Sequence, residues 1–269
     1  AADKVVTGHY SIPETDQGLN AYVASGVRCC HESTRAEDAL AKMRLGQYAQ
    51  LRYGSAWLDL PNLAAAITET DIDTRFANLI SDDTHPHTLV ANGHLDYILR
   101  KAVECGIDAV RAIQMMTINT ATCFRMDNEL GSITPGKCAD IVFLDSLEDL
   151  NVIRVLIDGE VVAENGACTF PLPPFEYPAW VTHSMHLGRA IAPETFRVEA
   201  PTDAAEGDAV CVRVIEVLPG SVPDREVRAA LTVTDGALES DLDQDVLKTF
   251  VFERHHETGT FGVGFTKGF

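Results

Sequence analysis

Residues 26–52 have the sequence GVRCCHESTRAEDALAKMRLGQYAQLR. Its two ends, Gly26 to Cys30 and Tyr48 to Arg52, are short apolar runs of the kind that form buried strands. Between them apolar residues recur at helical spacing, and Thr34 with Glu37 has the spacing of a capping box at a helix start. Strands joined through a helix usually run parallel, so this stretch predicts a parallel α/β sheet.

The same alternation continues on both sides, up to about residue 125. Apolar runs at Lys4 to Gly8 and Phe76 to Ser81 predict two further strands. A helix is predicted from His94, ending at Gly106, and Asp108 is placed to cap the next one. A complete (β/α)8 barrel needs roughly 250 residues. Four βα units therefore indicate either a small open sheet or the second half of such a barrel.

The remainder of the chain is predicted to be mainly β. Ala139 to Leu144 is an expected strand, and Val152 to Ile157, Asp158-Gly159 and Glu160 to Ala163 predict a hairpin with a tight turn. Prolines between 171 and 178 then predict a linker or an irregular crossing segment. Further strands are expected at Val210 to Val217, Ala229 to Thr234 and Val246 to Glu253.

Composition excludes several classes of protein. With 21 Lys+Arg and 40 Asp+Glu among 269 residues, the net charge is 21 − 40 = −19, which argues against a nucleic-acid partner. Apolar residues make up 46%, too many for a disordered chain, and no apolar run reaches the length of a membrane span. There is no signal-peptide pattern, and the seven cysteines form no disulfide or zinc-knuckle pattern, so a reducing cytoplasm is the expected location.

Polar side chains follow three of the predicted strands at the point where each strand ends. They are Thr7-Gly8-His9, Cys30-His31-Glu32 and Ser81-Asp82-Asp83. The carboxyl ends of parallel strands meet at one edge, where catalytic groups collect. Histidine and aspartate there predict a site for Zn, Fe or Mn, which would lower the pKa of a water. An adjacent aspartate could then move a proton to a leaving group.

Simpler interpretations remain open for each of these residues. A histidine after a strand is often only a hydrogen-bonded loop residue, and Asp82-Asp83 could be turn or capping residues. His85 lies in the loop beside them and could line the site. Glu32 could contact a substrate, support a ligand or be solvated, and Arg52 could contact a substrate or pair with acidic groups.

Longer motifs resemble a known family. LGSITPGKCADIVFLD, residues 130–145, resembles the barrel-exit segment of the amidohydrolase superfamily. More narrowly, VTGH at 6–9, SDDTHP at 81–86 and ERHHETGTFGVGFTKGF at 253–269 are similar to the adenine deaminase family. The resemblance extends over nearly the whole chain, and the C-terminal segments are the ones that narrow it from superfamily to family.

The resemblance implies an architecture for the chain. Residues 1–128 would be the C-terminal half of an amidohydrolase-type (β/α)8 TIM barrel, residues 129–168 a small β-domain segment, and residues 169–269 an incomplete, mainly β adenine deaminase-type C-terminal domain. The superfamily's His-x-His pair on its first strand and its bridging carboxylate on a middle strand have no counterpart in this sequence. The expected partner is therefore an N-terminal half-barrel of the same enzyme, and a homo-oligomer is expected.

The resemblance also implies an activity, hydrolytic deamination of adenine to hypoxanthine and ammonia in purine salvage or catabolism. A binuclear Mn or Fe centre, with Zn as the other ion that fits, would supply hydroxide for attack on C6. Because they match the family's ligand positions, His9, His31 and Asp82 would be metal ligands. Asp82 would also carry protons as the catalytic residue. Asp83 would contact the purine. The alternatives are another cyclic amidine or amide hydrolase of the superfamily, and an inert binding or assembly module.

Overall fold

The computed structural model describes residues 4–171, 173–218 and 224–268. The chain divides into two compact units, Ala1–Leu172 and Pro173–Phe269. Within the described ranges no helix is both long and apolar enough to cross a bilayer.

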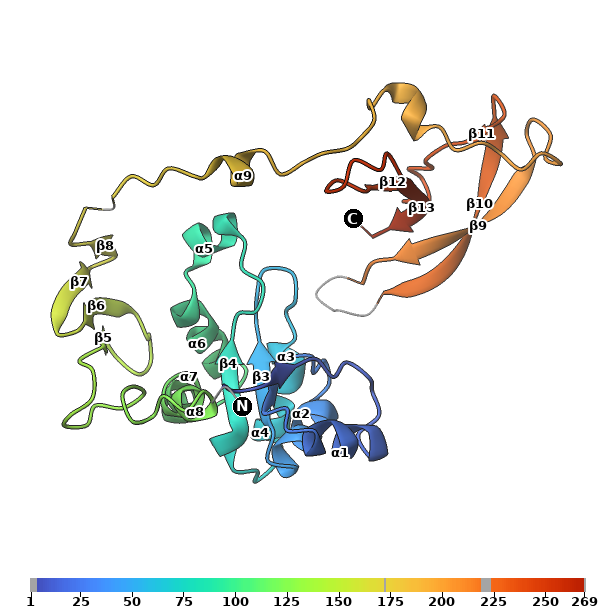
Figure 1. Ribbon diagram of the computed structural model, residues 1–269. Coiled ribbons are helices and arrows are strands. Elements are labelled where there is room, and N and C mark those ends of the chain that lie inside the picture. The colour runs from blue at the N-terminus through green and yellow to red at the C-terminus, as the bar shows by residue number, and fades with distance from the viewer. Residues whose placement is uncertain (1–3, 172, 219–223, 269) are drawn as a thin grey trace. The chain divides into compact units, whose positions relative to one another are not determined.

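The first unit contains a four-stranded sheet in the order β1-β2-β3-β4 (Figure 1). Its strands are β1 Thr7–Gly8, β2 Cys29–Cys30, β3 Tyr48–Arg52 and β4 Ala77–Ile80, and all three pairings are parallel. The predicted parallel sheet is confirmed, although β1 and β2 are shorter than their apolar runs. Because β3 and β4 pair from Ala49↔Ala77 to Arg52↔Ile80, their carboxyl ends lie level at one edge.

Helices connect and follow these strands. They are α1 Gln17–Ala24, α2 Ala36–Arg44, α3 Leu60–Leu63, α4 Ala65–Thr68, the 3-10 turn η1 Thr74–Phe76, α5 Pro86–Asn92, α6 Leu95–Glu104, α7 Ala109–Met116 and α8 Ile118–Cys123. The Asp108 cap is confirmed, because its carboxylate accepts a hydrogen bond from Arg111 N at 3.0 Å. The capping box at Thr34 and Glu37 is wrong by one residue: Arg35 precedes α2, and its N–H donates to Asp38 Oδ2 at 3.2 Å.

The core explains why alternate residues of the central strands differ in character. Ala49 and Leu51 of β3 pack with Leu79 of β4 and with apolar side chains of the helices in one buried cluster. The intervening residues point to the opposite face. There Gln50 and Arg52 are polar and nevertheless buried. One face of the sheet is thus a hydrophobic core, and the other carries buried polar groups.

Helix α8 fixes the amino end of the sheet. Arg28, just before β2, donates from Nε to the Cys123 carbonyl at 2.7 Å and from Nη2 to the Thr122 carbonyl at 3.0 Å. Asn78 Nδ2 of β4 donates to Thr120 Oγ1 at 3.1 Å. These bonds anchor one end of the strands and leave their carboxyl ends as the edge that displays His9, His31 and Asp82.

The last part of the first unit along the chain is a separate antiparallel sheet with the strand order β5-β6-β7-β8. Its strands are β5 Ile141–Leu144, β6 Val152–Ile157, β7 Glu160–Glu164 and β8 Ala167–Cys168. The predicted hairpin is confirmed: Asp158 and Gly159 join β6 to β7 with φ of 50° and 82°. Positive φ at both turn residues is what a tight primed turn requires.

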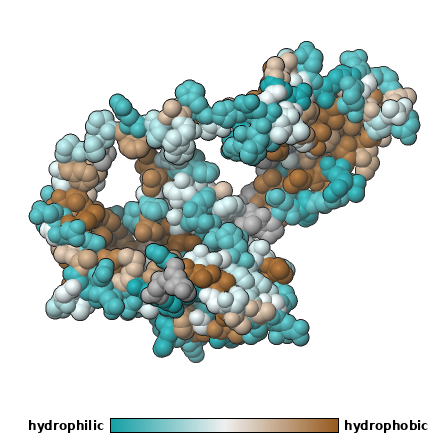
Figure 2. Space-filling view, viewed as in Figure 1, coloured by the Kyte–Doolittle hydropathy of each residue, from teal (hydrophilic) through white to brown (hydrophobic). Residues whose placement is uncertain are grey.

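The second unit is a five-stranded sheet in the order β11-β10-β9-β13-β12. It comprises β9 Ala209–Glu216, β10 Arg225–Thr234, β11 Ala237–Leu238, β12 Leu247–Phe252 and β13 Phe261–Lys267, preceded by α9 Ala179–Thr182 and η2 Pro193–Phe196. Strand β13 was not predicted, and it pairs parallel with β9. Hydrophobic residues gather over this sheet on the face that Figure 2 shows.

Candidate metal centre

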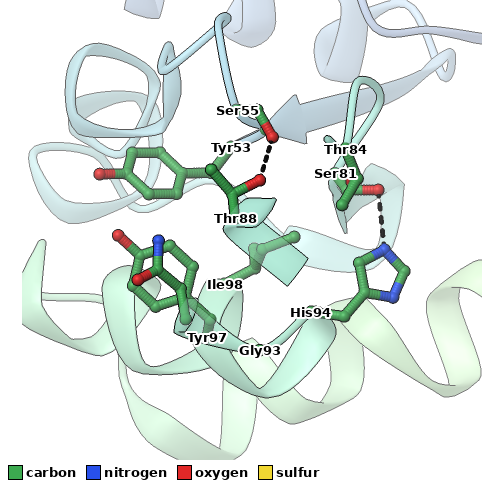
Figure 3. Close-up of a pocket in the computed structure, with 11 residues that line it drawn as sticks. Tyr53, Ser55, Ser81, Thr84, Thr88, Gly93, His94, Tyr97 and Ile98 are labelled. Atoms are coloured by element: carbon green, nitrogen blue, oxygen red, sulfur yellow. Dashed lines mark hydrogen bonds between the residues drawn. The ribbon is translucent and has the colours of Figure 1, made fainter. Parts of the chain in front are cut away.

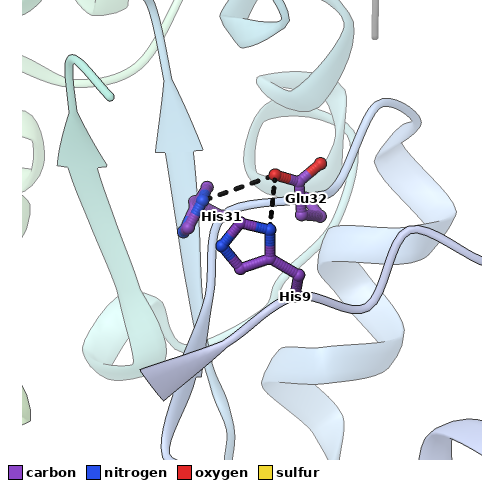
Figure 4. A group of neighbouring side chains, drawn as sticks. All are labelled: His9, His31 and Glu32. Atoms are coloured by element: carbon purple, nitrogen blue, oxygen red, sulfur yellow. Dashed lines mark ion pairs between the residues drawn. The ribbon is translucent and has the colours of Figure 1, made fainter. Parts of the chain in front are cut away.

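Two histidines and a glutamate meet at the carboxyl edge of the parallel sheet (Figure 4). His9 directly follows β1, and His31 and Glu32 directly follow β2. Glu32 Oε1 lies 3.3 Å from His9 Nδ1 and 3.4 Å from His31 Nε2. The two imidazole rings stand edge to face, with centroids 4.4 Å apart and planes at 78°. One carboxylate oxygen is therefore shared by both rings.

These separations suit ligands of a single ion. Two ligand atoms about 2.1 Å from a tetrahedral metal lie roughly 3.4 Å from each other. The two distances from Glu32 Oε1 match that spacing, and one donor atom from each of His9, His31 and Glu32 lies within 4.8 Å of the others. Imidazole nitrogen and carboxylate oxygen are donors that Zn, Fe and Mn accept. The residues present fit a divalent transition metal.

Asp82 lies beside this group at the end of β4. Its Oδ1 is 3.7 Å from His31 Nε2, and its side chain is 22% exposed. The backbone at Asp82 has a φ of 62°, a left-handed conformation that non-glycine residues other than Asn and Asp seldom adopt. The turn after β4 therefore aims the carboxylate toward His31. The structure brings His9, His31 and Asp82 to one edge, and their roles as ligands stay a prediction.

Burial and charge act in opposite directions on His31. Its side chain is 18% exposed, and this burial lowers its pKa, while the nearby carboxylate of Asp82 opposes the shift. The net pKa is below the ordinary value, so the imidazole is mostly neutral near pH 7. A neutral ring is the form that binds a metal. His9, by contrast, is 68% exposed, which leaves the group open on one side.

Arg52 reaches the same edge from the end of β3. Its Nη1 lies 3.3 Å from Glu32 Oε1 and 3.0 Å from Asp82 Oδ2. Burial would lower the pKa of this guanidinium, but the hydrogen bond and charge of Asp59, the charge of Glu32 and the hydrogen bond to Asp82 hold its pKa above the ordinary value. A permanently charged group thus sits between two carboxylates of the site.

Two other expected site residues are engaged elsewhere. Asp83 Oδ2 accepts hydrogen bonds from the backbone N–H groups of Ser55 at 2.9 Å and Ala56 at 2.6 Å, and Oδ1 accepts from Trp57 N at 3.4 Å. His85 is exposed and precedes α5, and its backbone N–H donates to Ser55 Oγ at 2.8 Å. No described contact joins either side chain to the two histidines of the metal centre. Substrate contact by Asp83 and His85 stays a prediction.

The loops after β3 and β4 enclose a small pocket next to this edge (Figure 3). His94 Nε2 and Ser81 Oγ are 3.1 Å apart on one side, and Ser55 Oγ is hydrogen-bonded to Thr88 Oγ1 on the other. Tyr53, which directly follows β3, and residues of α5 and α6 complete the lining. The pocket shows that the βα loops of the last two strands are bound to each other.

Sequence reasoning missed three residues that support the site. Asp59 is 1% exposed, and its Oδ2 accepts a hydrogen bond from Arg52 Nε at 2.7 Å. The Trp57 ring stacks on the same guanidinium, 5.1 Å from its centre. Lys42 is a buried cation that bonds to the loops after β1 and β2. A charged residue inside an apolar pattern was the available signal, as in the segment WLDLPNL at 57–63.

Comparisons with known proteins identify relatives of this chain. The Amidohydrolase family profile matches residues 59–162, and the Adenine deaminase C-terminal domain profile matches residues 221–269. Curated relatives called adenine deaminase match all of this chain: one from Clostridium botulinum (strain ATCC 19397 / Type A) at 57% identity over 268 residues, one from Moorella thermoacetica at 45% over 269 and one from Roseobacter denitrificans at 40% over 268.

The matched region is only part of each relative. The chain spans 44% of the length of the C. botulinum and R. denitrificans proteins and 45% of the M. thermoacetica protein. Among solved structures, a β-aspartyl dipeptidase from Fervidobacterium islandicum aligns with 64% of this chain and 51% of its own, at 17% identity and a TM-score of 0.49. The chain therefore contains a region similar to the amidohydrolase family and another similar to the adenine deaminase C-terminal domain, and along its whole length it is similar to part of proteins called adenine deaminase.

Proposed function

We propose that this chain supplies the metal-binding edge of an enzyme that converts adenine and water to hypoxanthine and ammonia. The observation that carries the proposal is the convergence of His9, His31 and Glu32 within 4.8 Å, with Asp82 beside them. It occurs in a chain that is 57% identical, along its whole length, to a protein called adenine deaminase.

The proposed architecture follows from the sheet. Four parallel strands with buried polar groups on one face and a helix-covered core on the other are half of what an eight-stranded barrel contains. We therefore infer that residues 1–128 form the C-terminal half of a TIM barrel, that 129–168 form a β-domain segment and that 169–269 belong to the C-terminal domain. An N-terminal half-barrel would complete the metal site.

The chemistry divides between the ion and the side chains. A divalent metal, with Mn or Fe favoured and two ions expected, supplies a Lewis acid that lowers the pKa of water when bound. His9 and His31 would hold it through Nδ1 and Nε2, the atoms that face Glu32. Glu32 Oε1 would be a further ligand, or would orient both rings.

Asp82 is the proposed proton carrier. Its carboxylate accepts a proton from water as the oxygen bonds to C6 of adenine, and returns it to the exocyclic nitrogen, N6. The C6–N6 bond then breaks and ammonia leaves. The 22% exposure of the Asp82 side chain is consistent with this role, because the carboxylate must face both the ion and the substrate.

Such an enzyme would act in purine salvage or catabolism. We infer a cytoplasmic location, because the cysteines described as free in the structure fit a reducing compartment. A homo-oligomer is also proposed.

The test uses the complete protein, including an N-terminal half-barrel. We expect ammonia release from adenine and much less from guanine, cytosine or cyclic ureides. His9→Ala and His31→Ala should abolish turnover and lower bound metal, whereas Asp82→Asn should keep much of the metal and lose turnover. His255→Ala, an exposed histidine of the second unit, is the control. Absence of ammonia from adenine, with the metal bound, would reject adenine as the substrate. Unchanged metal content and rate in both histidine variants would reject the site.

A further inference from the structure

Arg52 occupies an unusual position for an arginine, because its side chain has no exposed surface. Three carboxylates surround it: Asp59 at Nε, 2.7 Å away, and Glu32 and Asp82 at Nη1, 3.3 and 3.0 Å away. The Trp57 ring covers the guanidinium plane. Arg52 Nη2 is buried without a hydrogen-bond partner among the described residues, so the contacts at Nε and Nη1 set the orientation of the group.

This burial argues against contact between Arg52 and a substrate. A residue that binds a small molecule must present a donor to the pocket, and the one donor of Arg52 that has no described partner, Nη2, is buried. Its polar contacts run inward instead, from the loop that carries Asp59 to the carboxylates at the edge of the sheet. Arg52 therefore acts on the site only through other residues.

The two contacts at Nη1 have a specific geometric consequence. Glu32 Oε1 accepts from Arg52 and is also the atom that faces His9 Nδ1 and His31 Nε2. Asp82 uses Oδ2 for Arg52 and keeps Oδ1 toward His31. Two carboxylates near one imidazole repel each other unless a cation lies between them. The planar guanidinium holds both in place because its donors have fixed directions, which a lysine ammonium lacks.

We propose that Arg52 is a positioning residue, anchored by Asp59 and Trp57, that fixes Glu32 and Asp82 at the spacing a metal and a proton transfer require. The proposal rests on the proposed function of this edge. It adds that Asp59 and Trp57 of the β3–α3 loop act through Arg52, at the end of β3, on the carboxylates that follow β2 and β4. Arg52 itself contacts neither ion nor substrate. Burying the charge carries a desolvation cost, which the three carboxylates offset.

The experiment compares Asp59→Asn and Arg52→Lys in the complete, metal-loaded protein. Asp59→Asn keeps the shape of the anchor and removes its charge, and Arg52→Lys keeps the charge and removes the planar donors. Loss of a residue that orients metal ligands costs about 10- to 100-fold in affinity or activity. We expect a drop of at least about 10-fold in kcat, a smaller change in KM, and an altered visible spectrum of the Co²⁺-substituted protein.

The matched control is Asp73→Asn. Asp73 also accepts a hydrogen bond from an arginine Nε, that of Arg75, at 2.7 Å, but this pair is exposed. We expect the Asp73→Asn variant to have the kcat, the KM and the Co²⁺ spectrum of the wild-type protein. The metal spectrum is measured without adenine, so it tests Arg52 even if adenine proves to be the wrong substrate. If Asp59→Asn and Arg52→Lys both keep the wild-type Co²⁺ spectrum and kcat while the wild-type protein deaminates adenine, Arg52 has no positioning role and the proposed function stands. Should Asp59→Asn fail to fold, Arg52→Lys decides the outcome by the same two measurements.

Discussion

Gly54 lies directly against Asp83. A Cβ atom at position 54 would be 1.9 Å from Asp83 Oδ1, 2.4 Å from the Asp83 carbonyl oxygen and 2.6 Å from the Ser81 carbonyl oxygen. Two of these three obstacles are backbone atoms, which cannot rotate away. The loop after β3 can therefore close on the loop after β4 only because position 54 has no side chain.

The first prediction concerns this contact. Gly54→Ala should lower the free energy of unfolding by about 1–3 kcal/mol, the usual cost of forcing an extra methyl group into a packed site. Chemical denaturation measures the loss. Gly262→Ala is the matched control, since no atom lies within 4 Å of the place its methyl group would take, and it should change stability little. Equal stabilities of the two variants would contradict the close packing at Gly54.

Asp83 provides a second prediction, because its carboxylate accepts three backbone N–H groups of the β3–α3 loop. Asp83→Asn retains only one acceptor oxygen and removes the charge. We expect a loss of about 1–3 kcal/mol in unfolding free energy, as hydrogen bonds to charged groups typically contribute. The exposed Asp71→Asn is the control. An increase in KM for adenine with stability unchanged would instead indicate the substrate contact that the family resemblance implies.

Lys42 connects the two histidine loops, which gives a third prediction. Its Nζ donates to the Tyr10 carbonyl at 3.2 Å and to Ser33 Oγ at 2.9 Å, next to His9 and close to His31. Lys42→Met keeps an unbranched side chain that is one heavy atom shorter, and it removes both bonds. Metal affinity should fall about 10-fold, because orientation of the ligand loops is lost. Metal titration of the complete protein measures the change.

The control for Lys42 is Lys101→Met. Lys101 is partly exposed on α6 and pairs with Glu104. Metal affinity should be unaffected by this substitution. If Lys42→Met binds metal as tightly as Lys101→Met, then the two loops are held by other contacts.

A fourth prediction concerns pH and Glu253. Hydrogen bonds from the backbone N–H groups of His255, His256 and Thr258 lower the pKa of Glu253 from 4.5 to about 2. Because the folded-state pKa is below the unfolded one, the stabilisation is present above about pH 4.5 and disappears as the pH falls toward 2. The difference in Tm between wild type and Glu253→Gln should therefore narrow over that interval. A constant difference would show that the carboxylate charge contributes nothing.

Local sequence predicted the elements whose signals are local. Strand β3 has the predicted bounds, the Asp158-Gly159 hairpin forms, and Asp108 caps α7. Strand β13 was missed because Gly262 and Gly264 weaken a strand pattern. It pairs antiparallel with the neighbouring β12 and parallel with β9, which is about fifty residues away in the chain. Pairing over that distance depends on the assembled sheet and leaves no trace in the spacing of β13 itself.

The residues of the candidate site also fall into those that local sequence predicts and those that it does not. His9, His31 and Asp82 could be selected from sequence because each directly follows an apolar run, and parallel strands bring those ends together. The sequence could not predict that Glu32 Oε1 faces both histidines, or that Arg52 bonds to Asp59. Both contacts depend on the directions of side chains that come from different strands. Their identification required the folded chain.

The left-handed backbone at Asp82 restricts which substitutions evolution could accept there. Glutamate would preserve the acid, but it adopts a φ of 62° less readily than aspartate does, so the substitution would strain the backbone. Glycine would adopt the positive φ easily but would remove the carboxylate. Asparagine would satisfy the main chain and the shape but not the charge. Of these residues aspartate alone combines an acid with a readily adopted left-handed backbone, so replacing the proposed proton carrier would also require a different turn after β4.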